Sequence, residues 1–142
     1  MSTKELLDNT SSISTTLNIG KTLMKTKVTE QEYKILMDAA KKTDAQGARS
    51  VGSNGLCRYR GPNGLKCFVG HMIPDEEYHS GLEGCLASEE GVWDALEGLD
   101  YRLVAIVDQC QLYHDYKDRW SEALKNNPYA MQDFLDTLVE VG

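Results

Sequence analysis

The sequence lacks several features that would assign it to a broad class of protein. No apolar run approaches the roughly 20 residues that a membrane-spanning helix needs. The first residues show neither the basic region nor the apolar core of a secretory signal, so we expect a cytoplasmic protein with reduced cysteines. The sequence contains no internal repeat of the kind that would indicate a solenoid. These absences favour an ordinary soluble globular protein.

The usual catalytic and nucleotide-binding motifs are missing as well. Neither GxxxxGK[ST] nor GxGxxG occurs, which argues against an ordinary nucleotide-hydrolysing or dinucleotide site. There is no nucleophile elbow, and the many carboxylates between 75 and 100 are typical of solvated helix starts rather than of an acid/base pair. We therefore predict no catalytic residue, no enzymatic activity and no cofactor.

The excess of acidic residues is unevenly distributed. The formal charge of −7 disfavours direct nucleic-acid binding, because that binding needs a basic surface. Residues 49–70 contain four basic side chains and no acidic one, whereas residues 71–101 contain nine acidic side chains and no Lys or Arg. The two blocks either pair with each other, present opposite fields to partners, or are simply solvated. Whether the acidic block imitates nucleic acid stays open.

The apolar pattern predicts an α+β fold that is mostly helical, with about five helices around a short two-stranded hairpin. We expect residues 1–27 to be a loosely ordered arm, with a possible helix over 17–25, and residues 28–142 to be one globular domain. A capping box, Thr29 with Glu32, begins a helix that ends near Thr43. Further helices are predicted over 88–96, 101–125 and 128–139, with a single turn over 74–78. Ser88 is the expected cap of the first of these, and a break within 113–116 of the second is an alternative.

The predicted hairpin pairs 56–60 with 65–69 around the turn Gly61-Pro-Asn-Gly64. If Arg60 lies opposite Leu65, Cys57 and Cys67 point to opposite faces. A bulge in the turn would exchange the faces of one strand.

The hairpin suggests three kinds of chemistry. A zinc site would use Cys57, Cys67 and His71 with Cys85 or His79, but no CxxC knuckle supports it, and we predict no metal. Activation of a thiol by His71 and the nearby cations is a second hypothesis, against which buried cysteines are the commoner case.

Anion binding is the third hypothesis. Arg58, Arg60 and Lys66 lie beside the small loop 52–55, and guanidinium groups and loop amides suit phosphate or carboxylate. The competing interpretation is that Arg58 and Arg60 pair with carboxylates at 75–77 and join the hairpin to the next turn. We favour this pairing.

The segment from Gln46 to Gly84 resembles a small, largely uncharacterised family encoded by phages and bacteria. The resemblance rests on Cys57-x-Tyr59-Arg60, Gly64, Lys66-Cys67-x-Val69-Gly70, Ile73-Pro74-Asp75, Tyr78 and Glu83-Gly84, with a similar lead-in at 46–50. Phe68 and His71 depart from the family pattern, the first standing where a small residue is common. The resemblance implies a phage or prophage accessory protein that interferes with a host enzyme or defence system.

We therefore expect a non-catalytic binding module that contacts a host protein. A binder of small anions or nucleotides, or a small enzyme acting on them, is the alternative, and a structural zinc module is the second alternative. The expected binding surface consists of Arg58, Tyr59, Arg60, Lys66, His71, Asp75 and Tyr78. The sequence does not indicate an oligomeric state.

Overall fold

The structure, a computed structural model, describes residues 24–142. Within them the α-helices are α1 (Glu30–Gln46), α2 (Glu90–Trp93), α3 (Val104–Asp115), α4 (Arg119–Leu124) and α5 (Ala130–Asp136). The strands are β1 (Thr26–Val28) and β2 (Val139–Val141). Short 3-10 turns are η2 (Pro62–Gly64), η3 (Val69–Met72), η4 (Asp75–Glu77), η5 (Ser80–Leu82) and η6 (Tyr101–Leu103). The predicted class, α+β and mostly helical, is confirmed.

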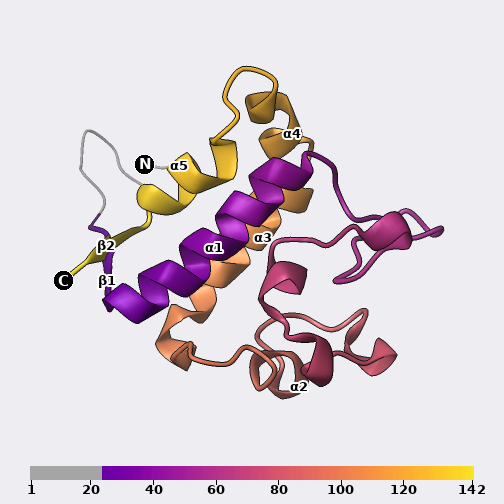
Figure 1. The fold of residues 1–142 in the computed structure, drawn as a ribbon, viewed down its shortest axis with the longest axis horizontal. Helices are drawn as coiled ribbons and strands as arrows, with labels where there is room; N and C mark the ends of the chain where they lie inside the picture. Colours follow the sequence, from indigo (N-terminus) through magenta and orange to yellow (C-terminus); the bar gives the residue numbers. More distant parts are fainter. Residues whose placement is uncertain (1–23) are drawn as a thin grey trace.

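The molecule has a helical part and a loop-rich part (Figure 1). Helix α1 crosses the centre of the view, α3 lies behind it, and α4 and α5 lie above it. Residues 47–100, drawn in magenta tones, form the loop-rich part at the right and below, where η3 packs against α1. None of the helices in the described part of the chain combines the length and the apolar character needed to cross a bilayer.

The capping box of α1 is confirmed. The Glu32 amide donates to the Thr29 hydroxyl at 3.0 Å, and the Thr29 amide donates to the Glu32 carboxylate at 2.9 Å. The helix ends later than predicted, at Gln46, because Gly47 adopts the left-handed conformation at φ 72° and closes it there. The extra turn places Asp44 and Gln46 where their side chains form hydrogen bonds with other segments of the protein.

The two-stranded sheet differs from the predicted hairpin. It is parallel and joins the two ends of the described chain, with Thr26 opposite Val139 and Val28 opposite Val141. β-branched residues at these positions suit a strand, and Lys27 pairs with Glu140 at 2.6 Å across it. Of the predicted arm, residues 26–27 therefore belong to a strand, and residues 1–23, with most of the possible helix at 17–25, lie outside the described residues.

The predicted hairpin forms a turn without regular strands. An isolated antiparallel bridge joins Arg60 to Lys66, one residue later than the predicted partner Leu65. The turn is longer than assumed because Asn63 and Gly64 both take positive φ, 61° and 77°. This register puts Cys57 and Cys67 on the same side, so the prediction that they face apart is wrong.

The C-terminal helices are shorter than predicted. The expected helix over 101–125 is divided, but later than the alternative of 113–116 proposed: α3 continues to Asp115, and Lys117 and Asp118 take positive φ of 50° and 58° before α4. The division turns Trp120 into the core, where it is fully buried. The last helix stops at Asp136, and Val139 belongs to β2 instead. Helix α2 is a single turn without a side-chain cap, so Ser88 does not cap it.

Asp44 joins three helices of the core. Its buried carboxylate accepts the indole N–H of Trp120 on α4 at 2.8 Å. It also accepts the amides of Met131 at 2.9 Å and Gln132 at 3.1 Å in the first turn of α5, and the side-chain amide of Gln132 at 3.0 Å. These bonds satisfy amides that the start of a helix leaves without partners.

We expect Asp44→Ala to lower the free energy of unfolding by about 3–5 kcal/mol, because several buried donors lose a charged acceptor at once. Asp38→Ala is the matched control on the same helix. It removes only an exposed ion pair with Lys42, at 2.9 Å, and should change stability by less than about 1 kcal/mol. Urea unfolding measures both, and equal losses would contradict the role given to Asp44.

Candidate functional site

The carboxylate of Glu83 organises the loop-rich part. It accepts the backbone amides of Tyr59 at 2.9 Å and Arg60 at 3.0 Å, one on each oxygen, and the hydroxyl of Tyr78 at 2.7 Å. The Arg58 guanidinium lies 3.8 Å away. Within the described part of the chain, the amides of Tyr59 and Arg60 have no hydrogen-bond partner on a neighbouring strand. The Glu83 carboxylate accepts both of them instead, as a strand's carbonyl groups would.

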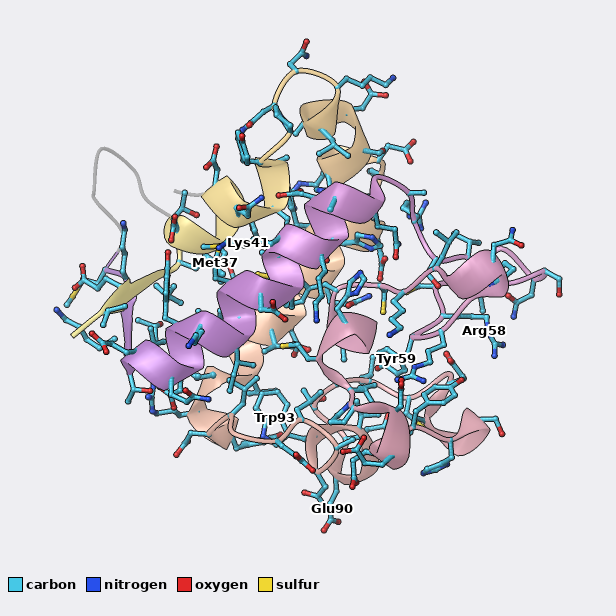
Figure 2. All side chains as sticks on the ribbon, viewed as in Figure 1. Met37, Lys41, Arg58, Tyr59, Glu90 and Trp93 are labelled. Carbon is cyan, nitrogen blue, oxygen red and sulfur yellow. The ribbon has the colours of Figure 1, made fainter. Side chains whose placement is uncertain are left out.

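Arg58 and Arg60 both pair with carboxylates of the chain itself. Arg60 pairs with Asp75 at 2.7 Å, donates to the carbonyl of Ile73 at 3.0 Å and lies over the ring of Tyr78 at 4.5 Å. Arg58 is the more exposed of the two and projects at the right of the molecule (Figure 2). Part of the basic block therefore pairs with the acidic block, as the pairing interpretation predicted. Arg60 takes the expected carboxylate at 75–77, whereas Arg58 takes Glu83.

The turn itself is held by neighbours from the end of α1. The Gln46 side chain donates to the carbonyl of Lys66 at 2.7 Å and accepts its amide at 3.0 Å, as a strand would. Ser50 donates to the carbonyl of Leu65 at 3.3 Å. At Gly70 the backbone approaches Tyr59 so closely that a Cβ would lie 2.0 Å from the Tyr59 carbonyl oxygen. Many residues of the resemblance thus have structural partners.

Cys57 belongs to a polar chain that ends in the core. The Gln111 amide donates to the Cys57 sulfur at 3.3 Å and to the Asp115 carboxylate at 2.6 Å, and its oxygen accepts the amide of Val69 at 2.9 Å. Asp115 contacts the buried ring of His114 at 2.6 Å. Burial is the largest single influence on the pKa of Asp115 and would raise it, but the hydrogen bonds with His114, Gln111 and Cys57 and the charge on His114 together hold this pKa below its usual value.

The thiol of Cys57 is not activated as a nucleophile. A hydrogen bond to Cys67, burial and the nearby Asp115 charge all raise its pKa, which keeps the thiol protonated. The His71 amide donates to the Cys67 carbonyl at 3.1 Å, and the His71 residue also lines a hollow with Gln31 and Asp38. Within residues 24–142 no hydrogen bond joins the His71 ring to the sulfur of Cys57 or Cys67, as the thiol hypothesis required.

The metal hypothesis is not supported within residues 24–142. No group of three or more His, Cys, Asp or Glu side chains there is arranged to hold a metal ion. Cys57 and Cys85 share the walls of one cleft, but neither His71 nor His79 is among its lining residues.

That cleft has a volume of about 460 Å³ and lies between the loop-rich part and α3. Its walls are Leu56, Cys57 and Tyr59, the loop from 83 to 87, and the face of α3 that carries Asp108, Gln111, Leu112 and Asp115. The Tyr59 hydroxyl donates to the carbonyl of Cys85 and so ties two walls together. A mainly apolar hollow with a few fixed polar groups is typical of a binding site.

Three of the large exposed apolar side chains stand at this cleft. Leu56, Leu86 and Leu112 are 65%, 68% and 53% exposed, and each comes from a different wall. Apolar side chains that gather in this way at one place mark binding surfaces, whereas single exposed leucines do not.

The predicted binding residues do not form one surface. Arg58, Arg60, Asp75 and Tyr78 gather around Glu83, but Lys66 is held by Gln46 and His71 lies in its separate hollow. Of these residues only Tyr59, labelled in Figure 2, lines the cleft, and it is buried.

Sequence reasoning missed the residues that line the cleft on α3 and the 83–87 loop. Leu112 had one available signal, because it is an apolar residue outside the buried stripe formed by Ile106, Val107 and Cys110. Leu86 had no comparable signal, since an isolated leucine in a loop predicts nothing.

Comparison with protein-family models, with curated proteins and with solved structures found no match. The functional argument therefore rests on the geometry of this chain.

We expect Gly70→Ala to destabilise the protein by about 3 kcal/mol or more, because the new Cβ meets rigid backbone at Tyr59. The control is Gly91→Ala in α2, where the nearest atom, a Leu82 methyl, lies at 3.9 Å. Alanine there should stabilise the helix by about 0.5–1 kcal/mol. Thermal unfolding of both variants tests the close approach, which equal effects would contradict.

The hollow around His71 predicts a pH effect on stability. Burial, reinforced by Lys66 and Lys42, lowers the pKa of His71 from 6.5 to about 4. The unfolded chain therefore takes up the proton first as the pH falls. Stability from this group is complete above pH 6.5 and decreases towards pH 4, by about 1 kcal/mol after allowance for solvent screening at a half-buried site. His71→Gln should flatten the profile of unfolding free energy in this window, and an unchanged profile would refute the assignment.

Proposed function

We propose that this protein is a non-catalytic binding module that holds a segment of a partner protein in the cleft between the 83–87 loop and α3. The observation that carries the proposal is the gathering of Leu56, Leu86 and Leu112, all exposed, around one cleft. Their burial against a partner would contribute about 25 cal/mol for each Å² of apolar surface removed from water.

The cleft walls suit binding better than catalysis. The Cys57 thiol is kept protonated, which favours a structural or contact role for this sulfur. Asp115 and Glu83 hold neighbouring donors and so give the walls a fixed shape. A preformed site loses little free energy to ordering when a partner binds.

The resemblance of residues 46–84 supports the biological setting of the proposal. We propose a phage-type accessory protein that acts in the host cytoplasm and interferes with a host enzyme or defence system. In such a role a small protein needs only to occupy a surface of its target.

The test is photo-crosslinking in the bacterial host with the full chain. A photoreactive amino acid replaces Leu86 or Leu112 at the cleft, or Lys41 as the control; Lys41 is exposed on α1 and lies outside the cleft lining (Figure 2). We expect the two cleft positions, and not position 41, to link to the same host protein. The purified pair should then lose at least about tenfold in affinity on Leu112→Glu, which puts a charge into the apolar contact.

Lys41→Glu should leave that affinity unchanged. If the cleft positions give no defined adduct, or if position 41 gives the same adduct as efficiently, the proposed function is wrong.

A further inference from the structure

The walls of the cleft are acidic as well as apolar. Three of the lining residues are carboxylates, Glu83, Asp108 and Asp115, and none is Lys or Arg. Two of these carboxylates are occupied: Glu83 by the amides of the turn, and Asp115 by Gln111 and His114. They shape the cleft and have little capacity left for a ligand.

Asp108 is different. Among residues 24–142 it makes no ion pair and its side chain has no hydrogen-bond partner, while burial raises its pKa. Asp108 is exposed, so water reaches its carboxylate, but the apolar surface beside it weakens the screening and makes the carboxylate a favourable contact for a cation. Leu112 follows one turn later on α3, so Asp108 and Leu112 present a charge and an apolar side chain on the same helix face.

The leucines indicate the size of the occupant. Leu56, Leu86 and Leu112 are each more than half exposed. A small molecule confined to the cleft would cover only their inner sides and would leave their outer sides in water. A polypeptide segment that crosses the cleft can cover all three and fill the hollow between them. The lining offers no Lys or Arg to an anionic ligand and has the carboxylate of Asp108, unpaired within the described chain, which disfavours a phosphate or nucleotide in this cleft.

We propose that the cleft binds a peptide segment of the partner that inserts an apolar side chain between the leucines and places an adjacent Lys or Arg against Asp108. This inference rests on the proposed function and adds the chemistry of the partner. The apolar contact supplies most of the affinity, and the ion pair at the edge of the cleft selects basic segments over acidic ones.

The test is a selection from a displayed library of random 12-residue peptides on the immobilised full-length protein. We expect enriched sequences in which an apolar residue stands next to Lys or Arg. Synthetic copies should bind about tenfold more weakly to Asp108→Lys, and binding should weaken as salt concentration rises. Glu90→Lys is the matched control, because it makes the same charge change at an exposed position of α2 outside the cleft lining.

A second pair of variants, Leu86→Glu and Leu112→Glu, separates the two proposals. Both positions are exposed, so folding should persist, and circular dichroism checks this. If these variants abolish peptide binding but Asp108→Lys does not, and the peptides lack basic residues, the inference fails while the binding function stands. If no selected peptide responds to the leucine variants, both fail.

Two other occupants of the cleft are also distinguishable. A second copy of the chain would appear as a dimer in light scattering that Leu112→Glu dissociates, and this result would overturn the peptide proposal. A small molecule would appear as a bound compound that is released on denaturation and that competes with the peptides, and it would likewise replace the peptide as the occupant.

Discussion

The loop-rich part of this protein depends on one carboxylate. Glu83 accepts two successive backbone amides, at Tyr59 and Arg60, and the hydroxyl of Tyr78, so a single side chain joins the turn to the segment that follows it. Without this acceptor the two amides would lack a partner of comparable strength, because no strand lies beside them. Leaving such donors unsatisfied in a part-buried position costs free energy. Because Glu83 satisfies them, the chain can keep an irregular path here without a sheet.

The cleft forms between helix α3 and the segments that the Glu83 carboxylate holds together. Asp44 fixes α1 to α4 and α5, and α3 packs against α4 and α5, which makes the helical part a firm base. The outer face of α3 then supplies one wall, and the segments held by Glu83 supply the others. Leu56, Leu86 and Leu112 remain exposed to water because they lie on the outer surfaces of α3 and of the segments held by Glu83. Exposed apolar surface of this kind is the physical basis for inferring a partner.

The local features were predictable from sequence because they depend on near neighbours. The capping box of α1 and the pairing of Arg60 with a carboxylate at 75–77 both follow from short-range patterns. The predicted hairpin did not form regular strands, because Gln46 and Glu83 took the hydrogen bonds that a strand partner would take. The register also shifted with the positive φ of two turn residues, and this brought Cys57 and Cys67 together.

By itself, the sequence determined the helical class, the start of α1 and the opposition of a basic and an acidic block, since these are set by composition and by residues a few positions apart. Only the tertiary structure decided where the candidate site lies. Tyr59 alone of the predicted binding residues lines the cleft, whose other walls come from α3 and the 83–87 loop. The physical reason is that a cleft forms from segments distant along the chain, whose approach depends on which buried donors and acceptors find partners during packing.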